Sequence, residues 1–187
     1  MQIVSSLLDL QSISIKDTQA AEAMKEGKNR VQSMALIHQN LYRQDNLKGV
    51  SAKEYIGQLL IYLKDSYNIL SNSLEITADI QDLNIDIDTM VPIGLMMNEL
   101  ITNVFKYAVP ASPHPQLEII LREVDTVLYL KIKDNGPGFI DLADAKTVKT
   151  FGMKMVRAFA QKLKARLEIE NNNGAVIQLF ITKYKTV

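Results

Sequence analysis

The chain of 187 residues has no cysteine and no tryptophan, and it has only two histidines. Without cysteine it can form neither a disulfide framework nor a thiolate metal site, which fits a reducing compartment. No apolar run approaches the roughly 18–20 residues that a membrane-spanning helix needs. The N-terminus also lacks the basic segment and hydrophobic stretch of a signal peptide. We therefore expect a cytoplasmic chain that makes no membrane contact itself, although a membrane segment preceding residue 1 would leave no trace here.

The charge balance and apolar content narrow the class of protein further. The 21 basic and 21 acidic residues cancel, so nothing indicates a surface for nucleic acid. A hydrophobic content of 47% with 22% charged residues is typical of a folded protein and not of a disordered one. The length suits one domain, or a small domain with a helical appendage.

Residues 1–47 have the pattern of a helical hairpin with one break between residues 12 and 17. Its second helix carries apolar residues at coiled-coil spacing. A hairpin this small cannot bury both of its apolar stripes alone, and pairing with a second copy into a four-helix bundle would do so. We therefore expect a homodimer through this hairpin. The expected seam consists of Met24, Val31, Met34, His38 and Leu41.

Residues 48–187 read as a second domain that mixes helices and strands. Its order is helix, strand, helix, two strands, loop, helix and two strands, which predicts an α+β fold: a two-layer sandwich of a mixed sheet with helices on one face, after the hairpin. A capping box at Ser51 opens the first helix, and Asp86 or Asp88 caps the second. The expected helices are 52–67, 88–109 and 151–164, and the expected strands are 74–80, 117–124, 126–133, 166–170 and 175–184.

One face of the helix expected at 88–109 carries polar side chains suited to bind Mg²⁺ and phosphates. Glu99, Asn103 and Lys106 are spaced i, i+4 and i+7, which places them in one row. An amide oxygen together with phosphate oxygens is enough to hold Mg²⁺, because this ion keeps several of its waters. Lys106 offers a point positive charge to phosphates. Taken alone, however, the same row is more typical of a solvated helix face.

The run Asp134-Asn135-Gly136-Pro137-Gly138-Phe139 follows an alternating apolar strand. Two glycines around a proline end the strand abruptly, and glycine lets another surface approach the backbone closely. Asp134 supplies a fixed acceptor beside this opening. Alone this would be an ordinary turn signal. Paired with the row on the preceding helix, it resembles the N box and first glycine box of the GHKL ATPases, the superfamily of histidine kinases, gyrase and MutL.

This resemblance implies roles for five residues of the N box. In the histidine kinases that the chain resembles, the residue matching Asn103 chelates Mg²⁺. The residue matching Glu99 orients or activates the attacking histidine, so Glu99 is the expected catalytic residue. Positions matching Lys106 and Tyr107 contact phosphate and the base or sugar of ATP. Asn98 stands where family members carry His or Asn, and it too is expected to contact phosphate.

The resemblance also implies the remaining nucleotide contacts. Asp134 matches the aspartate that accepts a hydrogen bond from the adenine amino group, and Gly136 and Gly138 match glycines that leave room for the base. Gly152 and Met153 lie in a run similar to the second glycine box, where free N–H groups at a helix start could hold phosphate. The alternative there is a plain helix N-terminus.

The segment between the glycine boxes, residues 139–151, is expected to form a short ATP lid. Thr147 and Lys149 are the lid residues that could reach the phosphates. Gly174 begins a run in the place of a terminal Gly-Thr pair, and a hairpin turn is its simplest explanation.

The first fifty residues look like the dimerisation and phosphotransfer helices of the HisKA_2 class of sensor histidine kinase. In that class the phosphoacceptor lies in a His-Arg-x-Lys-Asn-Asn-Leu-Gln-Ile stretch, and Met1 falls where the leucine would be. The acceptor is therefore expected upstream of this chain, which alone should not autophosphorylate. His38, in the expected seam, is read as a structural hydrogen-bonding residue, and His114 as a loop residue.

The sequence thus predicts an ATP-dependent protein-histidine kinase core. It would bind Mg²⁺-ATP and transfer the γ-phosphoryl group to a histidine, for relay to an aspartate on a response-regulator receiver domain. The alternative is a non-catalytic dimeric phosphotransfer or docking scaffold built on a degenerate ATPase fold. The helical hairpin argues against a serine kinase of the anti-sigma-factor type, which lacks one.

Overall fold

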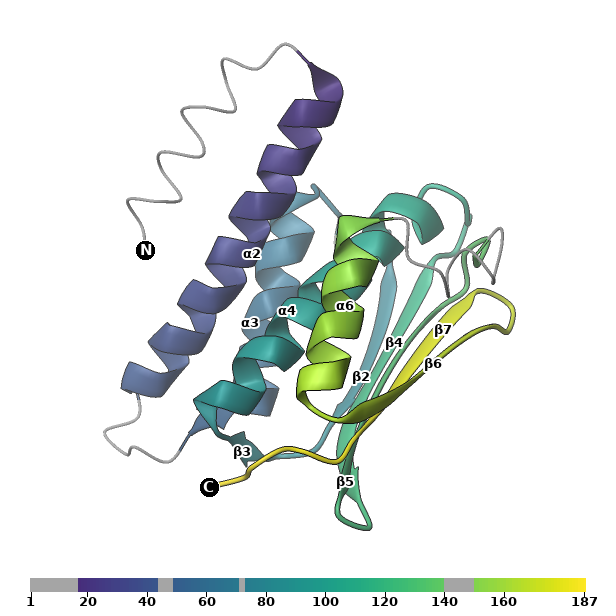
Figure 1. Ribbon diagram of the computed structural model, residues 1–187. Coiled ribbons are helices and arrows are strands. Elements are labelled where there is room, and N and C mark those ends of the chain that lie inside the picture. Colours follow the sequence, from purple (N-terminus) through teal and green to yellow (C-terminus); the bar gives the residue numbers. More distant parts are fainter. Residues whose placement is uncertain (1–16, 44–48, 71–72, 140–149) are drawn as a thin grey trace.

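A five-stranded sheet with helices on one face makes up most of the chain (Figure 1). The computed structural model describes residues 17–43, 49–70, 73–139 and 150–187. The helices are α2 (Thr18–Arg43), α3 (Ala52–Ser66), α4 (Ile87–Asn103), the π-helical turn η1 (Val104–Ala108) and α6 (Phe151–Lys162). The strands are β1 (Val50–Ser51), β2 (Glu75–Ile80), β3 (Asn84–Ile85), β4 (Gln116–Val124), β5 (Val127–Asp134), β6 (Ala165–Asn171) and β7 (Ala175–Ile181). The expected α+β sandwich is confirmed.

The sheet is mixed, with the order β2-β4-β5-β7-β6. β2 runs parallel to β4, and the other neighbours are antiparallel. Alternate residues of the central strand β5 are buried beneath the helices, including Leu128, Leu130 and Ile132. This period of two places Asp134 on the same covered face, at the end of the strand. β1 and β3 form a small separate ribbon that the sequence pattern did not predict.

The expected helix starts at Ser51 and Asp86 are confirmed. The Ser51 hydroxyl accepts a hydrogen bond from the Glu54 N–H at 3.3 Å, and a carboxylate oxygen of Asp86 accepts one from the Thr89 N–H at 2.7 Å. Each cap satisfies one of the backbone donors that a helix start leaves unpaired. Asp86, and not Asp88, is thus the cap of α4.

The last turn of the N-box helix departs from the expected α-helix. The Val109 N–H donates to the Val104 carbonyl at 3.1 Å, five residues back, and Val104–Ala108 form a π-helical turn directly after Asn103. A π turn holds one more residue than an α turn and is frequent at functional sites. Residues after Asn103, among them Lys106, therefore point in other directions than regular α-helical spacing predicts.

α2 packs against α3 and α4 through a stripe that differs from the expected seam (Figure 1). Met24, Val31 and Met34 are half-buried and His38 is exposed. Because the expected seam would be covered by a second copy, its burial in a homodimer stays a prediction. The side chain of Leu41 lies outside the described residues. The buried stripe consists instead of Asn29, Ser33, Ala35, Leu36, Ile37 and Asn40.

Several expected features fall outside the described residues: the first helix of the hairpin, its break up to residue 16, and lid residues 140–149 with Thr147 and Lys149. None of the helices that the structure does describe combines the length and hydropathy of a membrane span.

Candidate functional site

Asp134 ends the central strand with its carboxylate buried and oriented by the backbone. Its side chain is 8% exposed, and Oδ1 accepts hydrogen bonds from the N–H groups of Gly136 at 2.8 Å and Ala175 at 3.2 Å. No described residue donates to the second oxygen, Oδ2. A fixed carboxylate with one uncommitted oxygen is suited to accept a hydrogen bond from an amino group.

The glycines after Asp134 hold this turn against neighbouring segments. A Cβ atom on Gly136 would lie 2.5 Å from Cβ of Ala108, so only glycine lets the turn close on the π-helical turn η1. Gly138 has a φ of +70°, which favours glycine. The Asn171 amide fixes the next residue, since it accepts from the Phe139 N–H at 2.9 Å and donates to the Phe139 carbonyl at 2.8 Å.

Gly174 contributes to this site, although the sequence indicated only a hairpin turn. Its φ is +127°, and a Cβ atom there would lie 2.0 Å from the Asp134 carbonyl oxygen. The close approach lets the following N–H, that of Ala175, reach the Asp134 carboxylate. The Asn-rich turn was visible in the sequence, but its proximity to Asp134 arises from the pairing of β5 with β7.

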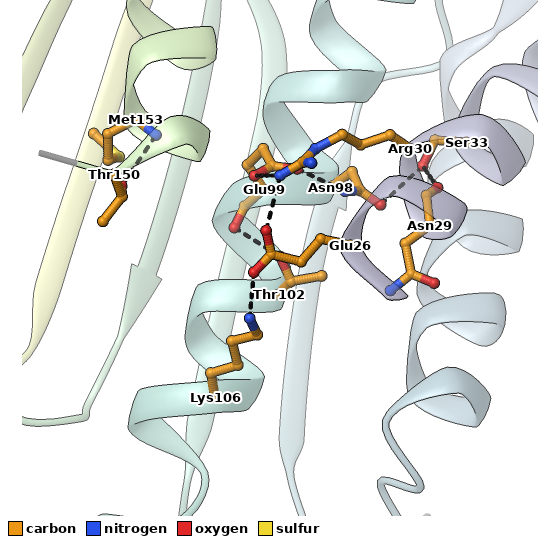
Figure 2. Close-up of polar contacts among 10 residues, drawn as sticks. All are labelled: Glu26, Asn29, Arg30, Ser33, Asn98, Glu99, Thr102, Lys106, Thr150 and Met153. Atoms are coloured by element: carbon orange, nitrogen blue, oxygen red, sulfur yellow. Dashed lines mark hydrogen bonds and ion pairs between the residues drawn. The ribbon is translucent and has the colours of Figure 1, made fainter. Parts of the chain in front are cut away.

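Glu99 lies in the middle of a polar network between α4 and α2 (Figure 2). Its carboxylate is almost fully buried and is held on both oxygens by one guanidinium group: Arg30 Nε lies 2.7 Å from Oε1, and Nη2 lies 2.8 Å from Oε2. The Asn98 amide donates to Oε1 at 3.1 Å and accepts from the Ser33 hydroxyl at 2.9 Å. Two residues of the expected site are thus bound to α2.

Lys106 is the third N-box residue that α2 holds (Figure 2). Its ammonium lies 2.5 Å from Glu26 Oε1 and 2.8 Å from Glu22 Oε1. Burial alone would lower the pKa of Lys106, but its hydrogen bonds to the two carboxylates outweigh this and raise it. For Glu26 the directions are reversed. Burial alone would raise its pKa, but the hydrogen bond to Lys106 and the charge of Arg30 lower it. Both groups of this ion pair are therefore charged at neutral pH.

Asn103 and Tyr107 are the two N-box residues that the network does not include. Asn103 is half-buried, and its amide makes no hydrogen bond to the described residues. Tyr107 is 61% exposed. The uncommitted amide oxygen of Asn103 fits a cation that takes few protein ligands, such as Mg²⁺.

The start of α6 meets the N-box helix at Gly152. A Cβ atom on Gly152 would lie 2.4 Å from Oε2 of Glu99, so the second glycine segment lies directly on the Glu99 carboxylate. Met153 is buried, and its N–H donates to the Thr150 hydroxyl at 3.4 Å (Figure 2). Thr150 therefore caps this helix, and the expected role of Gly152 and Met153 in binding the nucleotide stays a prediction.

Two glycine segments that are distant in the sequence therefore converge on the N box, at the C-terminal part of α4 and on η1. Gly136 lies against Ala108, Gly152 lies against Glu99, and Asn103 lies between these two points along the chain. Sequence reasoning missed the contribution of α2. The i, i+4 spacing of Glu26 and Arg30 was a visible signal of a helical ion pair, but it gave no sign that Arg30 reaches α4 and Glu26 reaches η1.

The comparisons with known proteins bear on the family and on the fold. The HisKA_2 family, described as histidine kinase, matches residues 1–67, which confirms the resemblance expected from the sequence. No curated protein matches the sequence.

Solved structures of histidine kinases share the fold at low sequence identity. The histidine kinase domain of a blue-light-activated kinase from Erythrobacter litoralis superposes with a TM-score of 0.78 at 16% identity, over 98% of this chain and 96% of that one. Against a longer chain of that kinase the TM-score is 0.70 at 20% identity, over 87% of this chain and 54% of that one. The histidine kinase AdeS of Acinetobacter baumannii gives 0.62 at 19% identity, over 95% and 94% of the two chains.

Proposed function

Because residues 1–67 match the HisKA_2 histidine kinases and the chain has the fold of a histidine kinase domain, we propose that it is the core of a protein-histidine kinase that uses ATP and Mg²⁺. ATP would supply the γ-phosphoryl group, and Mg²⁺ would neutralise charge on the phosphates. The acceptor would be a histidine outside this sequence, and a response-regulator aspartate would receive the group from it. Dimerisation through the helices of residues 1–47 is part of the proposal.

Each site residue would have one task. Asp134 would accept a hydrogen bond from the adenine amino group through its uncommitted oxygen. Asn103 would hold Mg²⁺ with its amide oxygen, and Lys106 would bind phosphate. Glu99 would orient the acceptor histidine and take its proton, because a buried carboxylate beside a nucleophile can act as a general base. Asn98, Tyr107 and the start of α6 at Gly152 would line the rest of the nucleotide site.

The observation that carries the proposal is the convergence of the two glycine segments on one helix. Gly136 and Gly152 come from segments on either side of the lid, and both need the absence of a side chain in order to approach α4 and η1. A plain turn or a plain helix start would not require this contact. Such close backbone approach is typical of nucleotide sites, where backbone N–H groups must come near phosphates.

Calorimetric titration with ATP tests the proposal. We expect micromolar binding that weakens without Mg²⁺ and is lost when GTP replaces ATP. The Asp134→Asn variant is a sharp control, because an amide oxygen can still accept the two backbone hydrogen bonds while the NH₂ group replaces the free acceptor. This variant should fold normally by circular dichroism and lose adenine-selective binding.

Asn103→Ala should remove only the Mg²⁺-dependent part of the affinity. A folded wild-type protein that binds no ATP would contradict the kinase proposal and would favour a docking scaffold on a degenerate ATPase fold.

A further inference from the structure

We propose that residues 22–33 of α2 form a latch that competes with the phosphates of the nucleotide for the N box. ATP would bind when this part of the helix is released. The inference rests on the proposed function and adds its regulation. It starts from charges: Glu22 and Glu26 present carboxylates to the Lys106 ammonium, which is the group proposed to bind phosphate. A phosphate and these carboxylates cannot both take the same donors.

The latch also engages the proposed catalytic base. Both oxygens of Glu99 are occupied by Arg30, at 2.7 and 2.8 Å. While α2 is docked, an incoming histidine has to share these oxygens with the guanidinium. Docked α2 therefore withholds the phosphate-binding group and the base together. The single residue Glu26 links the two, because its carboxylate contacts both Lys106 and Arg30 (Figure 2).

Over residues 22–33 the contact between α2 and the rest of the chain is polar, and its hydrogen-bonding groups are not all paired. Asn29 and Ser33 are fully buried, and the Asn29 amide oxygen accepts from the Tyr62 and Ser66 hydroxyls at 2.8 and 3.0 Å. The Asn29 amide nitrogen, however, has no hydrogen-bond partner. Release would return this donor to water, so undocking costs less than it would for an apolar interface of equal size.

The second half of α2 gives the latch a fixed end. Ala35, Leu36 and Ile37 are buried, with Leu36 and Ile37 in the main hydrophobic core. Gly27 lies between Glu26 and the buried Asn29, and a Cβ atom at Gly27 would meet nothing within 4 Å. No packing requirement therefore explains a glycine at this helix-interior position, where it weakens the helix. The helix is thus locally weak within residues 22–33 and firmly packed at Ala35, Leu36 and Ile37.

Hydrogen exchange with and without ATP and Mg²⁺ tests this arrangement in the wild-type chain. Because coupling between two equilibria is reciprocal, nucleotide should speed amide exchange over residues 22–33 and leave residues 34–40 unchanged. The second segment is an internal reference on the same helix. If nucleotide binds and slows or does not change exchange over residues 22–33, the latch is wrong.

The variant Glu22→Gln/Glu26→Gln tests the competition for Lys106. It should raise ATP affinity about tenfold, the value of one charge-assisted contact, and should speed exchange over residues 22–33 even without nucleotide. Adenosine has no phosphates, so its affinity should be equal in variant and wild type. Glu170→Gln removes one carboxylate charge from an exposed position on β6 and should change neither readout.

The outcomes separate this inference from the proposed function. Equal ATP affinity in wild type and the double variant, with unchanged exchange, overturns the latch and leaves the kinase proposal standing. A tenfold gain that adenosine shows as well overturns competition at the phosphates. If neither protein binds ATP or adenosine, the proposed function fails and the latch fails with it.

Discussion

Gly152 lies directly against the carboxylate of Glu99: a Cβ atom on Gly152 would come within 2.4 Å of Oε2, the oxygen that Arg30 holds at 2.8 Å. Glu99 could move away from an added methyl group only by giving up part of its bond to Arg30. The second glycine segment, the N-box helix and α2 are therefore linked through a single carboxylate.

Two glycine-to-alanine variants should consequently have opposite effects on stability. Gly152→Ala should lower the free energy of unfolding by about 1–3 kcal/mol, the usual cost of overpacking, although alanine is the better helix former. Gly27→Ala is the matched control in α2, where open space surrounds the glycine. It should raise the free energy of unfolding by about 1 kcal/mol. Urea unfolding of both variants measures this, and a stabilised Gly152→Ala would refute the contact with Glu99.

Removing Arg30 from its ion pair with Glu99 should strongly lower the free energy of unfolding. Their side chains are 16% and 7% exposed, so Arg30→Met leaves a buried carboxylate without its partner. We expect a loss of about 3 kcal/mol in the free energy of unfolding. Arg166→Met is the same substitution at a guanidinium that is 65% exposed and paired with Glu168. It should cost about 1 kcal/mol or less, and equal losses in the two variants would contradict the burial argument.

Local signals in the sequence predicted most of the fold. The caps at Ser51 and Asp86 and the alternation of β4 and β5 depend on residues a few positions apart, so they could be found from the sequence. The docking of α2 on α3 and α4 could not be found from the sequence. Apolar spacing at Met24 and Val31 indicated a stripe for pairing with a second copy, whereas the stripe that docks within the chain is partly polar. Its Asn29 bonds to Tyr62 and Ser66, which lie 33 and 37 positions away.

The candidate site likewise divides into residues that the sequence predicted and contacts that it did not. The motif residues were identified from the sequence because each motif is continuous. Their partners were not, because the contact of Gly174 with Asp134 depends on strand pairing and that of Gly152 with Glu99 depends on helix packing. The π-helical turn after Asn103 left no recognisable pattern in the sequence.

The ion pair between Glu26 and Lys106 should make the docking of α2 depend on pH. The pKa of Glu26 is lowered from its ordinary value of 4.5, so its contribution is present above that pH and is lost as the pH falls through the lowered value. The pKa of Lys106 is raised from 10.5, so its contribution is present below that pH and is lost only at higher pH. Docking should therefore be strongest between about pH 5 and 10.

Amide exchange of residues 22–33, corrected for the intrinsic effect of pH on exchange, measures this dependence. Glu26→Gln should flatten the acid side of the profile, because the amide does not titrate. An acid limb that persists unchanged in Glu26→Gln would assign the dependence to another group.

Gly94 and Tyr55 offer a double-mutant test of the packing beneath the site. A Cβ atom on Gly94 would lie 2.3 Å from the Tyr55 hydroxyl oxygen, which is buried and has no hydrogen-bond partner. Gly94→Ala alone should lower the free energy of unfolding by about 2–3 kcal/mol. Tyr55→Phe alone should be neutral or stabilising by up to about 1 kcal/mol, because it removes a buried polar group that is unpaired. In the Tyr55→Phe background Gly94→Ala should cost at least about 1 kcal/mol less, a coupling typical of residues in contact. Additive effects of the two substitutions would show that the hydroxyl does not lie over Gly94.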